Sequence, residues 1–194
     1  MKILVINPGS TSTKIAVYVD EIAYLVKNIR HSVEELANYP EVMDQFEFRK
    51  QLVVEELERQ GIPFSFDVVI GRGGLLKPLP GGVYEVNEVM IHDTRYAIRS
   101  HACNLGCLIA ADLASSLPGC RAFIADPGVV DELDDVARIT GSPLMPRITI
   151  WHALNQRAVA RHYATEQSIA HPKHPVRYED LNLIICHLGG GISV

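Results

Sequence analysis

The segment at residues 7–12 reads Asn-Pro-Gly-Ser-Thr-Ser, and Lys14 follows it closely. It separates two apolar runs, residues 2–6 and 14–19, which are too close together for a crossover helix. We therefore expect an antiparallel hairpin whose turn presents backbone N–H groups and hydroxyls to an anion, with Lys14 as a point charge. The turn is not a P-loop, because no helix follows it and the Gly-Lys-Ser/Thr ending is missing. An ordinary hairpin turn without a ligand is the alternative.

A second glycine-rich turn lies at residues 187–193, which read His-Leu-Gly-Gly-Gly-Ile-Ser. Consecutive glycines let a backbone approach a ligand closely, although a ligand-free β-turn can have the same composition. The apolar run at residues 181–187 before it is expected to be a buried strand. Two such turns, each after a buried strand, favour two similar subdomains that face a polyphosphate between them.

Cysteine and histidine spacing does not favour a metal site. The four cysteines lack Cys-x-x-Cys spacing and are expected to be reduced thiols. His171 and His174 have metal-like spacing, but the flanking prolines favour an exposed loop. A zinc site from His101, Cys103 and Cys107 is not expected, because Cys107 lies where the apolar stripe of a helix needs a small residue.

The elements that must hold these residues form a mixed α/β pattern. Apolar runs and turn residues predict strands at residues 2–6, 14–19, 24–29, 67–70 and 122–125, and helices at residues 42–60, 105–117 and 154–164. The Gly- and Pro-containing stretch at residues 140–146 is the best linker candidate. We therefore expect a first domain at residues 1–146 and the beginning of a second, incomplete one at residues 147–194.

Composition narrows the classes of protein. The chain has 194 residues, of which 47 % are hydrophobic and 21 % charged, as in globular proteins. A net charge of −5 without a basic cluster argues against a nucleic-acid partner. No apolar run approaches the ~20 residues of a membrane span, and no secretory leader is evident, so a cytoplasmic protein is expected.

Taken together, these motifs resemble those of the acetate and butyrate kinase family. Four further motifs follow the family's order and spacing: Arg72-Gly73-Gly74, Ser100-His101-Ala102-Cys103-Asn104, Ile124-Ala125-Asp126-Pro127 and Ile150-Trp151-His152. The resemblance covers essentially the whole chain, and the three glycines of the second turn are similar to the butyrate kinase form. It implies the actin, sugar-kinase and heat-shock chaperone fold, a ribonuclease H-like mixed sheet.

The resemblance implies ATP- and Mg²⁺-dependent phosphorylation of a short-chain carboxylate such as butyrate, giving ADP and an acyl phosphate, and the reverse reaction. A kinase for propionate, a branched-chain acid or acetate is an alternative, as is a non-catalytic half-domain that binds phosphate. Expected partners are a short-chain fatty acid or its acyl phosphate, and either a second copy of the chain or the missing C-terminal half. Neither nucleic acid nor membrane is expected to bind.

Individual residues also match the family's site. Arg72 matches the catalytic, substrate-binding arginine, whose planar fork can clamp a carboxylate bidentately. Asp126 matches the catalytic aspartate, suited to a Mg²⁺ ligand with Asn7 beside it, and His152 matches the histidine that stabilises the charged transition state. His101 matches a histidine near the substrate. The nucleotide phosphates are expected at Asn7, Ser10, Ser12, Lys14, His187, Gly189, Gly190 and Gly191.

Two departures from the family pattern carry expectations of their own. Gly74 stands where acetate kinases typically carry a bulky aliphatic residue, so we expect room for roughly two more substrate methylenes, each worth about 0.8 kcal/mol when buried. That would favour butyrate or a branched acid. The family chain is also nearly twice as long, and its adenine-binding segment, a second arginine and a Mg²⁺-binding glutamate lie beyond residue 194. The 194-residue chain alone is therefore expected to be inactive or weakly active.

Overall fold

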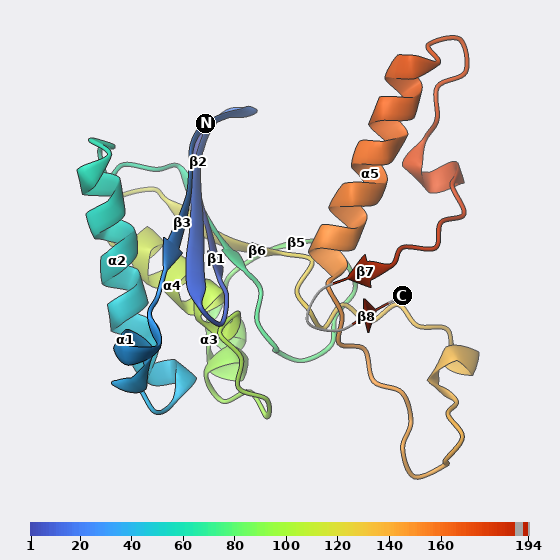
Figure 1. Cartoon of the computed structure of the whole chain (residues 1–194), viewed down its shortest axis with the longest axis horizontal. Coiled ribbons are helices and arrows are strands. Elements are labelled where there is room, and N and C mark those ends of the chain that lie inside the picture. Colours follow the sequence, from blue (N-terminus) through green and yellow to red (C-terminus); the bar gives the residue numbers. More distant parts are fainter. Residues whose placement is uncertain (189–191, 194) are drawn as a thin grey trace.

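A six-stranded mixed sheet organises the computed structural model, which describes residues 1–188, 192 and 193 (Figure 1). The strand order is β3-β2-β1-β4-β6-β5. The strands are β1 (Lys2–Pro8), β2 (Ser12–Val19), β3 (Ile22–Arg30), β4 (Val68–Arg72), β5 (Val83–Glu85) and β6 (Arg121–Ala125). The α-helices are α1 (Val33–Ala37), α2 (Gln45–Arg59), α3 (Glu88–Arg95), α4 (Asn104–Ser115) and α5 (Ala153–Ala170). Short 3-10 turns, η1 (Val42–Asp44), η2 (Asp135–Arg138) and η3 (Tyr178–Asp180), complete the regular structure together with the small hairpin of β7 (His187–Leu188) and β8 (Ile192–Ser193).

The expected three-stranded antiparallel meander is confirmed. β1 pairs with β2 from Lys2↔Val19 to Pro8↔Thr13, and β3 continues the sheet on the far side of β2. β1 runs past the expected end at residue 6, because Asn7 and Pro8 still have partners on β2. Only residues 9–11 therefore separate the two strands, as a tight hairpin requires.

The other half of the sheet is parallel. β4 runs parallel to β1, and β6 runs parallel to β4. β5 is the outermost strand and pairs antiparallel with β6. The carboxyl ends of β1, β4 and β6 consequently meet at one edge of the sheet. In open parallel sheets, this edge is where ligands bind.

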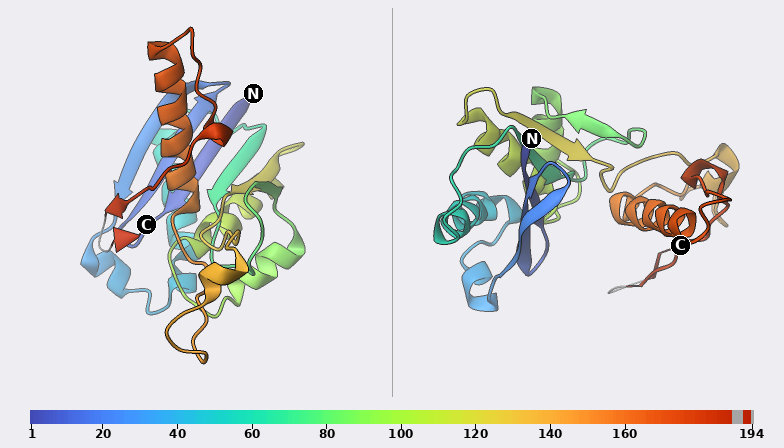
Figure 2. Two further views of the ribbon diagram at one scale, coloured as in Figure 1. Left: turned by 90° about the vertical axis from the view of Figure 1, so that its right-hand side faces the viewer. Right: turned by 90° about the horizontal axis from the view of Figure 1, so that it is seen from above.

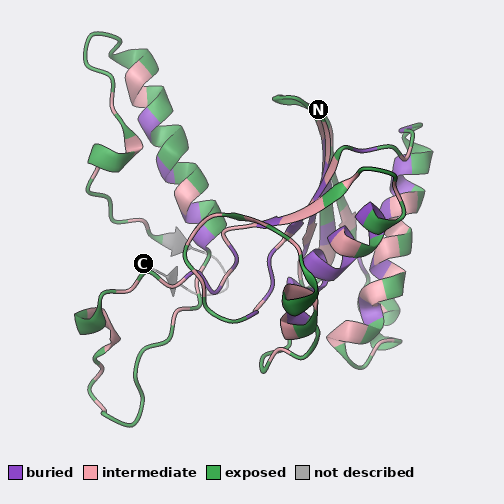
Figure 3. Cartoon of the chain, turned by 180° about the vertical axis from the view of Figure 1, so that it is seen from behind, coloured by how far each residue is buried: buried purple, intermediate pink, exposed green. Residues whose placement is uncertain are grey.

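The core lies between the sheet and the helices α2 and α4. Alternation along β2 buries Thr13, Ile15 and Val17, whereas Lys14 between them is exposed. Strand residues of this kind meet apolar side chains of both helices in one cluster, and the buried positions gather there (Figure 3). Strand β4 and helix α4 approach most closely at Gly71 and Gly106, where a side chain on either residue would collide with backbone atoms.

Helix α5 lies on the opposite side of the sheet from α2 (Figures 1 and 2). It extends six residues beyond the expected end at residue 164, and its buried face carries Ala153, Gln156, Ala160 and Ala164. The stretch at residues 140–146, expected to be a linker, contains no helix or strand. That residue 147 begins a second domain of similar plan stays a prediction.

The expectation of a buried strand at residues 181–187 is wrong. Residues 181–186 have no strand partner among the residues that the structure describes, and only the short β7, which starts at residue 187, is paired. Leu183 and Ile184 are 41 % and 89 % exposed. An apolar run forms a strand only where a neighbouring strand satisfies its backbone groups and another layer covers it. In the described part of the chain, no helix has the length and hydropathy needed to cross a membrane.

Acidification should lower the free energy of unfolding because it protonates His31, which is buried behind the first turn, the hairpin turn between β1 and β2. Its Nε2 lies 2.9 Å from the hydroxyl of Thr13, and that oxygen accepts a hydrogen bond from Arg49. Burial, followed by the charge of Arg49, lowers the pKa of His31 from 6.5 to about 4. Between these two pKa values, His31 is protonated in the unfolded chain but neutral in the folded chain. We therefore expect no loss of unfolding free energy from His31 well above pH 6.5, and a loss of up to roughly 3 kcal/mol as the pH drops to about 4.

Urea unfolding of the wild type and of His31→Gln between pH 7.5 and 4 measures this effect. Glutamine keeps a polar group for Thr13 but does not titrate, so the difference in unfolding free energy between the two proteins should change over that interval. A pH-independent difference would contradict the burial of a neutral His31.

Candidate functional site

Three polar side chains meet at the carboxyl edge of the parallel strands. Asn7 lies near the end of β1, Arg72 ends β4, and Asp126 directly follows β6. The register pairs Ile6 with Gly71 and Arg72 with Ala125, so these ends lie beside one another in space. The family resemblance had singled out these residues, and the strand order brings them together.

A cavity of about 450 Å³ opens at this edge. It is lined by five residues expected at the site: Asn7, Lys14, Arg72, Asp126 and His152. The remaining lining residues are Gly128, Trp151, Ala153, Leu154, Asn155 and Ala158. The start of α5 thus forms one wall, and the sheet edge forms the other.

The first turn has the expected hairpin geometry. The N–H of Gly9 donates to the carbonyl oxygen of Ser12 at 2.7 Å, and Asn7 faces Lys14 across the two strands. Directly opposed residues project to the same face of a sheet, which explains why both line the cavity. Ser10 and Ser12 belong to the turn but not to the cavity wall. The second turn at Gly189, Gly190 and Gly191 lies outside the described residues, and nothing is stated of the His187 side chain.

Arg72 supplies positive charge at the centre of the site. Its Nη1 makes a long hydrogen bond of 3.5 Å to Oδ1 of Asn7. His101 lies outside the cavity wall but is close enough that Arg72 lowers its pKa, after the larger effect of burial. Its Nδ1 accepts the backbone N–H of Cys103 at 3.1 Å, so the neutral ring carries its proton on Nε2. His101 is therefore available as a neutral hydrogen-bond donor near Arg72.

Asp126 is held in an unusual backbone conformation. Its φ is 34°, a left-handed value that is rare before proline, and Pro127 follows. Gly82 fixes it from both directions: the Gly82 N–H donates to Oδ1 at 2.9 Å, and the Asp126 N–H donates to the Gly82 carbonyl at 2.9 Å. Strained conformations of this kind persist where surrounding contacts over-determine them, and they cluster at functional sites.

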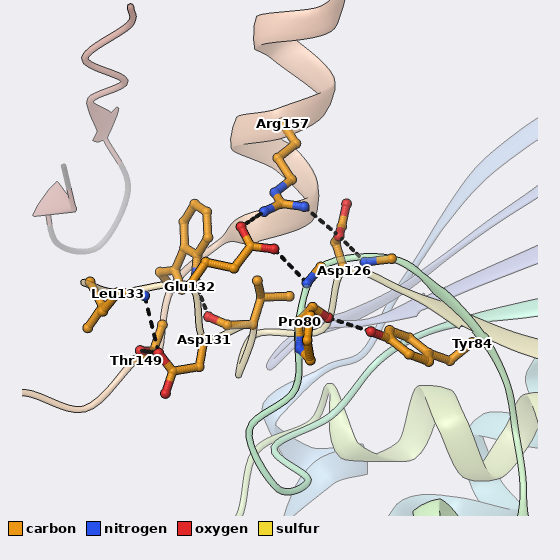
Figure 4. A network of polar contacts seen from close by, with 12 residues as sticks. Pro80, Tyr84, Asp126, Asp131, Glu132, Leu133, Thr149 and Arg157 are labelled. Carbon is orange, nitrogen blue, oxygen red and sulfur yellow. Dashed lines mark hydrogen bonds and ion pairs between the residues drawn. The ribbon is translucent and has the colours of Figure 1, made fainter. Parts of the chain in front are cut away.

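Arg157, which is not among the residues that line the cavity, is a partner of Asp126 that the sequence did not reveal. From α5, its guanidinium reaches across to Oδ1 of Asp126 at 3.2 Å and also pairs with Glu132 (Figure 4). Glu132 in turn accepts the N–H of Gly81 at 2.8 Å. These contacts thus connect three parts of the chain: the loop before β5, which contains residues 81 and 82, the end of β6, and helix α5. The only local hint is a basic residue early in the helix that follows His152.

The two ion pairs of Arg157 should differ in strength. Asp126 has 11 % of its side chain exposed and Glu132 has 47 %, and solvent screens the more exposed pair. In double-mutant cycles by urea unfolding, we expect Arg157→Met and Asp126→Asn to couple by about 1–2 kcal/mol. Arg157→Met and Glu132→Gln should couple by less than about 1 kcal/mol. Equal coupling in both cycles would contradict Asp126 as the principal partner.

Gly74 lies in a tighter place than expected. A Cβ on Gly74 would stand 2.6 Å from Cα and 2.8 Å from Oδ1 of Asn104, and 3.1 Å from a methyl group of Thr94. Oδ1 of Asn104 accepts the N–H of Leu75 at 2.9 Å. The missing side chain therefore makes room for Asn104, and Gly74 does not line the cavity. This geometry does not support the expectation that Gly74 opens space for substrate methylenes.

Comparison with known proteins shows which proteins this chain resembles. A probable butyrate kinase of Bacteroides thetaiotaomicron is 72 % identical over 194 residues, which are 100 % of this chain and 53 % of that protein. Butyrate kinase 1 of Clostridium acetobutylicum is 49 % identical over 195 residues, covering 100 % of this chain and 53 % of that protein. This chain is similar over its whole length to butyrate kinases. It spans about half the length of the curated relatives it matches. No family model matches the chain.

Solved structures support the fold assigned to the family. The crystal structure of Porphyromonas gingivalis acetate kinase superposes with a TM-score of 0.65 at 14 % identity, covering 99 % of this chain and 53 % of the other. Entamoeba histolytica acetate kinase superposes with a TM-score of 0.55 at 13 % identity, covering 88 % and 48 %. The expected mixed-sheet fold of the actin and sugar-kinase type is thereby confirmed.

Proposed function

We propose that this chain supplies the acceptor and phosphate side of an ATP- and Mg²⁺-dependent carboxylate kinase with butyrate as its preferred acceptor. The observation that carries the proposal is the shared cavity, in which a lysine, an arginine, an aspartate and a histidine converge from three strand ends and one helix. The names of the relatives add the substrate class. Activity is proposed for a protein of the relatives' full length.

The convergent charges suit the reaction. A carboxylate oxygen of butyrate attacks the γ-phosphorus of ATP, the bond to the bridging oxygen breaks, and ADP leaves with the electron pair. Both reactants are anionic, so the reaction needs positioning and charge neutralisation more than covalent help. Arg72 would hold the butyrate carboxylate, and Lys14 would meet the phosphates. His152 would stabilise charge on the transferred phosphoryl group.

The residues present fit a Mg²⁺ ion that arrives with the nucleotide. Asn7 and Asp126 offer amide and carboxylate oxygens, the hard ligands that Mg²⁺ prefers. Within residues 1–188, 192 and 193, no group of three or more His, Cys, Asp or Glu side chains is placed to hold a metal. Mg²⁺ sites of phosphoryl-transfer enzymes commonly combine one or two protein oxygens with water and phosphates. Bound there, the ion would neutralise phosphate charge.

A chimaera tests the proposed function. It joins this chain to the remaining length of the Bacteroides relative, which is 72 % identical over the shared part. Acyl phosphate formed with ATP and Mg²⁺ is trapped as the hydroxamate, with butyrate, isobutyrate, propionate and acetate compared at equal concentration. We expect the highest kcat/KM with butyrate. Activity confined to acetate or propionate, or none with any acid, would contradict the assignment.

Arg72→Lys in the chimaera should impair use of the carboxylate. Lysine keeps the charge but loses the fork that can contact both carboxylate oxygens. We expect kcat/KM for butyrate to fall by the equivalent of about 1–3 kcal/mol of transition-state binding. The matched control is Arg95→Lys, on the exposed end of α3 and outside the cavity. Unchanged butyrate kinetics in Arg72→Lys would remove Arg72 from the substrate site.

A further inference from the structure

A buried arginine lies directly behind the first turn. Arg49 of α2 is 0 % exposed. Its Nη1 donates to the carbonyl oxygens of Gly9 at 2.8 Å and Ser12 at 3.1 Å, and its Nη2 donates to the carbonyl oxygen of Ser10 at 3.2 Å. The same side chain contacts Gln45 and the Thr13 hydroxyl. One guanidinium therefore holds the backbone of the turn from its inner side.

All the carbonyls of this turn face into the protein. Three of them accept from Arg49, and the fourth, of Thr11, accepts the backbone N–H of His31 at 2.9 Å. A carbonyl oxygen carries partial negative charge and repels a phosphate. Because these oxygens are engaged on the inner side of the turn, an anion that approaches its outer side meets the hydroxyl-bearing residues Ser10 and Thr11, which are both exposed.

The charge of Arg49 lacks an acidic partner in the described structure, where its contacts are carbonyls, an amide and a hydroxyl. Burial lowers its pKa to about 10, so it remains protonated at neutral pH. The neighbouring Lys50 behaves differently, because it pairs with Glu47 and Asp112. A buried unpaired cation raises the electrostatic potential nearby, since little solvent screens it.

We propose that Arg49 is a positioning residue for anion binding: it orients the turn at residues 9–12 and supplies the positive field that a polyphosphate at the turn neutralises. The inference rests on the proposed phosphate role of this turn. Arg49 itself touches no substrate. It acts through the backbone whose carbonyls it holds, and through its charge at short range.

Titration of the 194-residue chain with pyrophosphate tests the inference. Calorimetry measures the affinity, and the NMR chemical shifts of the backbone amides of residues 9–12 report binding at the turn. The variants are Arg49→Met, which removes charge and donors, and Arg49→Lys, which keeps the charge but not the fork. Lys50→Met is the matched control, because it removes the same charge from the adjacent residue of α2. We expect affinity to fall at least about tenfold in Arg49→Met, the equivalent of one charged hydrogen bond, and less in Arg49→Lys. Lys50→Met should bind like the wild type.

A purely structural role predicts a different pattern. If Arg49 positions the turn for the phosphates, Arg49→Met in the chimaera should raise KM for ATP and leave KM for butyrate unchanged. If the substitution only loosens the fold, both KM values should rise. Pyrophosphate affinity retained in folded Arg49→Met would overturn the inference. If Arg49→Met does not fold, wild-type affinity and ATP KM in Arg49→Lys would overturn it. Absence of pyrophosphate binding by the wild-type chain would also overturn it, while hydroxamate formation by the chimaera reports separately on the proposed function.

Discussion

The 194-residue chain by itself should form butyryl hydroxamate at least ~10³-fold more slowly than the full-length chimaera. Removing a single preorganised charge donor commonly lowers the rate by ~10²–10³, and catalytic groups act as a unit. The family resemblance places a second arginine, a Mg²⁺-binding glutamate and the adenine-binding segment outside residues 1–194. The cavity retains Lys14 and Arg72, so anions should still bind while turnover is lost.

The measurement compares the purified chain and the chimaera at equal concentration, with the mass of each confirmed. Arg72→Lys in the isolated chain is the control for contaminating kinase, since a contaminant's activity would not respond to it. Turnover by the chain within the usual enzyme range of about 1–10³ s⁻¹ would show that the shared half is sufficient.

Gly106→Ala should destabilise the fold strongly, although alanine is the better helix former by about 1 kcal/mol. A Cβ on Gly106 would lie 2.3 Å from the carbonyl oxygen and 3.0 Å from the nitrogen of Arg72. The obstacle is backbone of β4, so the helix must move away from the strand. Overpacking costs about 1–3 kcal/mol and sometimes more, and here it also displaces the arginine proposed to bind substrate. We expect a net loss of about 2 kcal/mol or more of unfolding free energy.

Gly141→Ala provides the matched control for this substitution. Gly141 has no atom within 4 Å of its ideal Cβ and needs no positive φ, so alanine there should change stability by no more than about 0.5 kcal/mol. Urea unfolding measures both variants. Wild-type stability in Gly106→Ala would contradict the close packing of α4 on β4.

The apolar pattern failed at one segment for a clear physical reason. Residues 181–187 have the composition of a buried strand, yet Leu183 and Ile184 are exposed. Composition reports what a segment can bury, whereas strand formation also requires a pairing edge and a covering layer. The first meander succeeded because each of its strands has a neighbour only a turn away in sequence.

Local sequence determined the hairpin, the helices α2 and α4, and the kinds of side chain at the strand ends, because periodicity and turn residues act within a few residues. The family resemblance, rather than periodicity, indicated Asn7, Lys14, Arg72, Asp126 and His152, which the fold brings to one cavity. Only the tertiary structure showed that Gly74 faces Asn104, that Arg157 pairs with Asp126 from 31 residues away, and that Arg49 holds Gly9 from 40 residues away. These contacts depend on strand order and helix packing, which bring distant residues together without leaving a periodic pattern in the sequence.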